Sequence, residues 1–145
     1  MQLLNKILTA VLITAILVSI GIIIYINVTP NPRDRFTEFY ILNADGKAAD
    51  YPRQVKSGEP VELILGIVNR EMETVSYSVK IMADTTLVKS IDIGVMPNGS
   101  KWEQKISFIP ITSGTDQKYE FFLYSGDSNQ PHIKNPLALI LDVNK

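Results

Sequence analysis

The sequence predicts an all-β, immunoglobulin-like sandwich of about seven strands preceded by one transmembrane α-helix. Three observations lead to this prediction. An uncharged apolar run occupies 7–28, alternation of apolar and polar residues begins after Arg35, and clusters of Gly, Pro, Asn and Asp interrupt that alternation at short intervals. The chain therefore divides into four parts: a short tail at 1–6, an anchor at 7–28, a Pro-rich tether at 29–35 and one β domain at 36–145.

The apolar run at 7–28 predicts a membrane-spanning helix. It contains no charged residue and would extend roughly 33 Å as a helix, enough to cross a hydrocarbon core of about 30 Å. A cleaved signal peptide is the alternative, because Lys6 precedes the run. However, the apolar region of a signal peptide is usually only about 7–15 residues long, and no clear small-residue cleavage site follows this run. We therefore expect a retained anchor in the lipid bilayer.

The anchor is expected to place the N-terminus in the cytoplasm and the β domain outside it. Only a short segment precedes the helix, which is typical of a signal anchor, whereas the few flanking charges barely discriminate between the two orientations. The tether contains two prolines and spans at most about 25 Å. The sequence thus predicts a single-pass cell-membrane protein whose C-terminal domain stays close to the bilayer.

The strands of the β domain are predicted from period-two alternation. The clearest example is 75–81, where Val75, Tyr77, Val79 and Ile81 alternate with polar residues. The segment 61–69 is apolar on both faces and predicts a central strand, whereas 52–60 is interpreted as a connection. The predicted strands are 36–42, 61–69, 75–81, 87–95, 101–108, 118–125 and 137–143.

Composition excludes several classes of function. The chain has 14 Lys+Arg and 15 Asp+Glu, with a net charge of −1 and no basic patch, so nucleic-acid binding is not expected. It has no cysteine, which removes disulfides and thiolate chemistry. The glycines are isolated in turns, so no phosphate-binding loop is present and no cofactor is expected.

Catalytic and metal-binding residues are not expected either. His132 is the only histidine; a Ser-His-Asp triad through it is formally possible, but no nucleophile motif supports one and an exposed loop histidine is the better interpretation. The segment 127–129 resembles the start of a calcium loop but lacks the later glycine and glutamate. The pairs Glu59/Glu62 and Glu71/Glu73 are interpreted as solvated carboxylates, and we expect no enzyme activity.

Three residues are candidates for modification or ligand contact. Asn98 begins the sequon Asn-Gly-Ser in a predicted exposed turn, so it is a possible glycosylation site, although Asn-Gly is also common turn chemistry. A second sequon at Asn27 is expected to lie too close to the bilayer. Tyr51, in a predicted loop, and Tyr124, at a strand end, are possible ligand contacts because aromatic rings stack on sugars.

Several short motifs in the β domain resemble a known family. They are 35–42 (RFTEFYIL), 46–52 (GKAADYP), 58–60 (GEP), 65–69 (LGIVN) and 121–124 (FFLY). Together they resemble domain of unknown function family 1616, a family of mostly archaeal membrane proteins, from about Arg35 to Leu141. The resemblance implies a surface β domain but no activity. Many members carry several membrane helices before this domain, whereas this sequence predicts one.

The expected function is therefore that of a non-catalytic protein-binding or assembly module at the cell surface. The expected partner is a membrane or cell-envelope protein, which would pair with a sheet face or an edge strand. The alternative is a carbohydrate-binding or surface-polysaccharide accessory protein with a glycan as its ligand.

Overall fold

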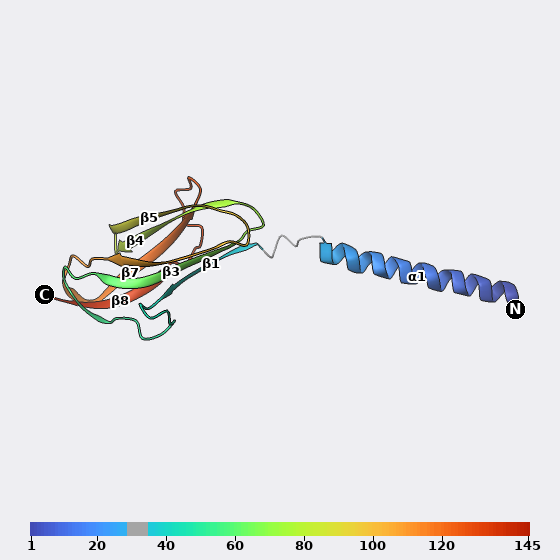
Figure 1. The fold of residues 1–145 in the computed structure, drawn as a ribbon, viewed down its shortest axis with the longest axis horizontal. Helices are drawn as coiled ribbons and strands as arrows, with labels where there is room; N and C mark the ends of the chain where they lie inside the picture. Colours follow the sequence, from blue (N-terminus) through green and yellow to red (C-terminus); the bar gives the residue numbers. More distant parts are fainter. Residues whose placement is uncertain (29–34) are drawn as a thin grey trace. The chain divides into compact units, whose positions relative to one another are not determined.

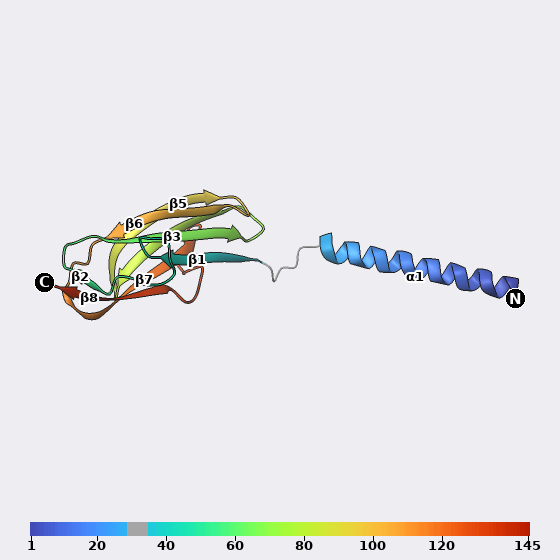
Figure 2. The same cartoon turned by 60° about the horizontal axis from the view of Figure 1, so that its bottom comes forward.

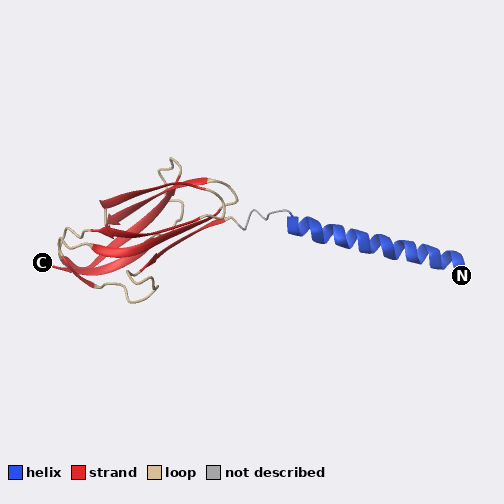
Figure 3. Ribbon diagram, viewed as in Figure 1, coloured by secondary structure: helices blue, strands red, loops and turns tan. Residues whose placement is uncertain are grey.

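The structure is a computed structural model that describes residues 1–28 and 35–145. It contains two compact units, Met1–Asp34 and Arg35–Lys145. In Figure 3 the described part of the first unit is a helix, and the second unit is built from strands joined by loops. The predicted tether at 29–35 falls, except for Arg35, outside the described residues.

Helix α1 spans Gln2–Val28 and is long and apolar enough to cross a membrane. It begins before the predicted start at Ile7, so residues 2–6 are also helical. Four polar side chains of the apolar run bond to backbone carbonyls one turn earlier: Thr9 to Asn5, Thr14 to Ala10, Ser19 to Ala15 and Asn27 to Ile23, at 2.8–2.9 Å. Each of these bonds gives a polar side chain an acceptor within the helix, which suits an apolar solvent.

The second unit is a sandwich of two sheets (Figures 1 and 2). One sheet has the order β1-β3-β6 and the other β2-β8-β7-β4-β5. All strand pairs are antiparallel except β2 with β8, which is parallel. The strands are β1 (Phe36–Leu42), β2 (Gln54–Lys56), β3 (Val61–Arg70), β4 (Val75–Ala83), β5 (Thr86–Met96), β6 (Lys101–Phe108), β7 (Gly114–Ser125) and β8 (Leu137–Asn144).

The immunoglobulin-like sandwich is confirmed, with eight strands in the described residues instead of about seven. The additional strand, β2, lies inside the segment 52–60 that was predicted to be a connection. It has only three residues and pairs Val55 with Val143, so it is too short to show alternation. β7 also starts earlier than predicted, at Gly114, because Gly114 already pairs with Val143 of β8; an irregularity then interrupts the pairing between Gly114 and Gln117.

The core lies between the two sheets. Alternate residues of β3, β4, β7 and β8 point inward, so the side chains of Leu65, Val79, Phe121 and Leu141 are 0% exposed. The Phe108 ring contacts Phe121 edge-on, with 6.1 Å between ring centroids. Burial of these apolar side chains stabilises a domain that has no disulfide.

The outer face of the three-stranded sheet carries paired charges. Its ion pairs are Arg70–Glu38, Lys101–Glu103 and Lys105–Glu62. In the centre of this face the Tyr40 ring covers Gly66, its partner across β1 and β3, and occupies the space that a Cβ at position 66 would need. The Tyr40 hydroxyl donates a hydrogen bond to Glu103.

Candidate functional site

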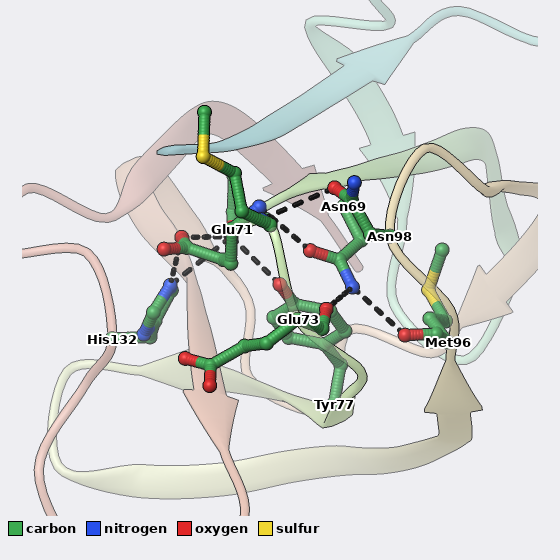
Figure 4. A network of polar contacts seen from close by, with 9 residues as sticks. Asn69, Glu71, Glu73, Tyr77, Met96, Asn98 and His132 are labelled. Carbon is green, nitrogen blue, oxygen red and sulfur yellow. Dashed lines mark hydrogen bonds and ion pairs between the residues drawn. The ribbon is translucent and has the colours of Figure 1, made fainter. Parts of the chain in front are cut away.

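Four polar side chains meet at the N-terminal end of the sandwich, the end at which β1 begins. Thr37 lies on β1, Glu71 in the β3–β4 turn, Tyr77 on β4 and His132 in the loop between β7 and β8. We call these four residues the polar cluster. They come from four segments that the fold of both sheets brings together, and Figure 4 shows His132 and Glu71 facing one another.

The hydrogen bonds of the polar cluster lead to the carboxylate of Glu71, the final acceptor. Thr37 Oγ1 donates to Glu71 Oε1 at 2.7 Å, so the Tyr77 hydroxyl, 2.8 Å away, must donate to Thr37. His132 Nε2 lies 2.9 Å from the same Glu71 oxygen. Because a carboxylate only accepts, Nε2 carries a proton.

Burial and hydrogen bonding act in opposite directions on the Glu71 carboxyl. Its side chain is 15% exposed and that of His132 is 24% exposed. Burial alone would raise the Glu71 pKa, but hydrogen bonds from Thr37 and His132, with the charges of His132 and Arg35, outweigh it and lower the pKa. For Tyr77, burial raises the pKa of the phenol. The ionised form of Glu71 is therefore the one that this site stabilises.

This geometry differs from that of a catalytic triad. In a triad one imidazole nitrogen contacts the acid and the other contacts the nucleophile. Here the single nitrogen Nε2 of His132 approaches both Glu71 and Thr37, the latter at 3.0 Å. The prediction that His132 is an exposed loop residue is wrong: its backbone N–H donates to Leu123 O, and its ring contacts Tyr77.

Asn69 holds the neighbouring turn in place and is 0% exposed. Its amide nitrogen donates to the carbonyls of Glu73 and Met96, at 2.8 Å each, and its oxygen accepts from the Glu71 N–H at 2.9 Å. Figure 4 shows its amide between these backbone groups. Asn69 thus fixes the turn that presents Glu71 to His132.

The predicted carboxylate pairs do not converge. Glu71 belongs to the polar cluster, whereas Glu73 contributes its carbonyl to Asn69. Glu59 and Glu62 lie near different lysines, Lys56 and Lys105. Within residues 1–28 and 35–145, no three His, Asp or Glu side chains are arranged to hold a metal ion.

The two candidate ligand-contact tyrosines have other partners. Tyr51 is half-buried, packs against the core and donates its hydroxyl proton to Ile41 O at 2.8 Å. Tyr124 is half-buried on the outer face of β7, where Lys80 Nζ lies 4.6 Å from its ring centroid. The structure does not bring these two residues together in one site, and ligand contact stays a prediction for both.

The candidate glycosylation residue, Asn98, is exposed in the turn between β5 and β6. Its side-chain oxygen accepts from the Met72 N–H at 3.1 Å. The Ser100 N–H donates to Pro97 O at 3.1 Å, which closes the turn, and Gly99 has a φ of 78° that a glycine adopts without strain. The turn chemistry expected of Asn-Gly is therefore present.

An apolar groove of about 390 Å³ lies at the opposite end of the sandwich, between the start of β5 and the loop after β6. Val88, Ile109 and Ile111 line it, and we call these three residues the apolar edge patch. Ile109 and Ile111 are 49% and 77% exposed, whereas Pro110 between them is fully buried. The loop is held by hydrogen bonds from Gly58 N–H to Pro110 O at 3.0 Å and from Ser57 Oγ to Ile111 O at 3.2 Å.

Sequence reasoning missed both features. The polar cluster joins residues up to 95 positions apart in sequence, and no local pattern links them. The apolar edge patch had a weak signal, since Ile-Pro-Ile at 109–111 follows directly after a predicted strand.

Solved structures with a similar fold include an archaeal domain. The crystal structure of the CARDB domain of a Pyrococcus furiosus protein, in complex with di-metal ions, has a TM-score of 0.53 and 15% identity, covering 80% of this chain and 98% of that chain. The solution NMR structure of the same domain has a TM-score of 0.50 and 16% identity, covering 76% and 97%. At this identity the similarity shows the fold alone.

No curated protein matches the chain. A family does match it, over residues 30–144, and this range includes every strand of the sandwich. The motifs of the β domain that resemble family 1616 lie within that range. The protein therefore belongs to the family described as Domain of unknown function (DUF1616).

Proposed function

We propose that this protein is a membrane-anchored, extracytoplasmic module that docks, without catalysis, on another membrane or cell-envelope protein. Helix α1 is the proposed anchor, with the N-terminus in the cytoplasm. The apolar edge patch is the proposed contact. The patch is the observation that carries this proposal.

The chemistry of the apolar edge patch supports a protein partner. Exposed isoleucine side chains have no hydrogen-bonding groups, so covering them is favourable through removal of apolar surface from water. Polar groups line the same groove beside these isoleucines: Lys89 crosses from β5 and donates to Ser107 O on β6. An apolar centre with a polar rim is the usual anatomy of a protein–protein interface.

The rigidity of the patch supports the same proposal. Buried Pro110 and the hydrogen bonds to Pro110 O and Ile111 O fix the backbone, so Ile109 and Ile111 point outward before any partner arrives. A preorganised contact loses little conformational entropy on binding. The outer face of the three-stranded sheet, by contrast, has its charges paired within the domain.

Site-specific photocrosslinking tests the proposal. A benzophenone amino acid at Ile111 should form an adduct of one defined mass in native membranes. The same probe at Glu62, on the outer face of the three-stranded sheet, should not. Ile109→Asp should abolish the adduct, whereas Leu87→Asp, which changes a 53% exposed side chain outside the patch, should leave it. Equal labelling from positions 111 and 62 would contradict the proposal.

The proposed topology has a separate test. Because the chain has no cysteine, one introduced cysteine reports its location without background. In intact cells, a membrane-impermeant maleimide should label Asp127→Cys, which is in an exposed loop, and should not label Gln2→Cys until the membrane is permeabilised. The reverse pattern would overturn the orientation.

A further inference from the structure

We infer that Asn98 is the residue of this chain that carries an N-linked glycan, and that Asn27 is not. This inference rests on the proposed function in one respect: it requires the β domain to face the compartment where glycans are added. Both residues begin an Asn-x-Ser/Thr sequon. The two residues differ in the hydrogen bonding of the atom that must react, the side-chain amide nitrogen Nδ2.

The two amides are used in opposite ways. Asn27 Nδ2 donates to Ile23 O at 2.8 Å, within the apolar helix α1. Asn98 instead uses its oxygen, which accepts from the Met72 N–H at 3.1 Å. This bond orients the amide with Nδ2 on the other side, in an exposed turn.

The bond from the Met72 N–H to the Asn98 oxygen supports an unusual backbone conformation at Met72. Met72 adopts a φ of 61°, an unusual conformation for a residue with a side chain. Its N–H finds its acceptor outside the β3–β4 turn, on Asn98. Glycosylation leaves the amide oxygen in place, so the modified residue can still accept from Met72 while the sugar extends into solvent.

The reaction is a glycosyl transfer from a lipid-linked oligosaccharide phosphoester. Asn98 Nδ2 forms a bond to C1 of the first sugar, and the bond from C1 to the phosphate oxygen breaks. The lipid phosphate leaves with the electron pair, and Nδ2 loses one proton to a base of the transferase. No group is oxidised or reduced.

The first sugar would lie beside Met72, whose side chain is 37% exposed. A glycan there would cover the N-terminal end of the sandwich, at the β3–β4 and β5–β6 turns. The apolar edge patch, at the other end, would remain free for a partner.

The test uses the full chain expressed in cells that add N-glycans, with intact mass and glycosidase sensitivity as the measurements. Wild type should gain the mass of one glycan. Asn98→Asp keeps an oxygen acceptor for Met72 but removes the nitrogen, so it should lose the glycan. Its unfolding temperature should stay within about 3 °C of the unglycosylated wild type, as for other surface changes. Asn27→Gln should keep the glycan.

A second glycosylation sequon, introduced by mutation, tells why the wild type lacks a glycan if none is found. Asp84 has a φ of 51° in the exposed β4–β5 turn and is followed by two threonines. Asp84→Asn therefore creates a sequon at a position whose left-handed backbone asparagine tolerates. It is introduced into the Asn98→Asp chain.

The outcomes separate the two proposals. If the Asp84→Asn acceptor is glycosylated and wild type is not, the inference on Asn98 is overturned and the topology stands. If neither chain is modified, the domain does not face the glycosylating compartment, and both the inference and the proposed topology are overturned. A glycan on wild type that persists in Asn98→Asp but disappears in Asn27→Gln would reverse the assignment.

Discussion

Asn69→Ala should destabilise the domain more than any other single polar substitution at the N-terminal end of the sandwich. The change leaves the carbonyls of Glu73 and Met96 and the N–H of Glu71 without their side-chain partner. A buried polar group left unsatisfied costs about 1–3 kcal/mol. Met96 O is buried and takes the full cost, whereas water can partly reach the other two groups.

The expected total is therefore about 3–5 kcal/mol, a large part of the roughly 5–15 kcal/mol that stabilises a typical domain. For about 100 residues this corresponds to a fall in unfolding temperature of at least about 12 °C. The measurement is urea unfolding of the chain in mild detergent, followed by the fluorescence of Trp102. This is the only tryptophan, and it packs against the core.

Two further variants separate the contributions of the Asn69 amide. Asn69→Asp keeps an acceptor for the Glu71 N–H but cannot donate at neutral pH, so it should be about as unstable as Asn69→Ala if donation to the two carbonyls dominates. Asn98→Ala, produced in a host without N-glycosylation, removes one exposed bond and should cost less than about 1 kcal/mol. If Asn69→Ala unfolds within about 1 kcal/mol of wild type, water or backbone relaxation satisfies these carbonyls and the reasoning is refuted.

Three more predictions address the polar cluster, the outer face and the core. The folded state lowers the pKa of Glu71 from its ordinary value of 4.5, so the ionised carboxylate stabilises the fold above about pH 4.5 and this contribution is lost as pH falls further. The stability difference between wild type and Glu71→Gln should therefore narrow below pH 4.5 in urea titrations, and a constant difference would contradict this. Gly66→Ala should lower the free energy of unfolding by about 1–3 kcal/mol, because the new Cβ would displace the Tyr40 ring. In a double-mutant cycle, the same substitution should cost less in the Tyr40→Ala background. Strictly additive losses would count against the contact. Phe121→Ala should cost about 3–5 kcal/mol in chemical unfolding, clearly more than Phe122→Ala on the outer face, and equal losses would show that the buried face is misassigned.

Strand periodicity was enough to predict the sandwich. Val75, Tyr77, Val79 and Ile81 alternate with polar residues because one face of β4 is buried and the other is wet, and the structure buries Tyr77, Val79 and Ile81. The same signal fails for β2, since three residues cannot establish a period. β2 exists because the backbone of 54–56 meets the end of β8, a contact between segments that are distant in sequence.

The polar cluster could not be predicted, for a related reason. His132 follows a proline in a polar loop, which by itself indicates exposure. Its partial burial comes from the β3–β4 turn, which brings Glu71 to it across 61 positions of sequence. Hydrophobic pattern identifies which residues face the core, but it does not specify which loops of the two sheets converge at one end.

The two ends of the sandwich differ in a way that bears on the proposed docking. At the N-terminal end the turns are tied together by hydrogen bonds among polar side chains and by the buried amide of Asn69. At the opposite end, Ile109 and Ile111 are fixed in position by backbone bonds, yet their side chains remain uncovered. Within the sandwich, this uncovered end lies opposite the end at which β1 begins. If the crosslinks of the Ile111 probe instead mapped to a second copy of the same chain, the apolar edge patch would still be the contact, but it would join two sandwiches and no different partner would be required.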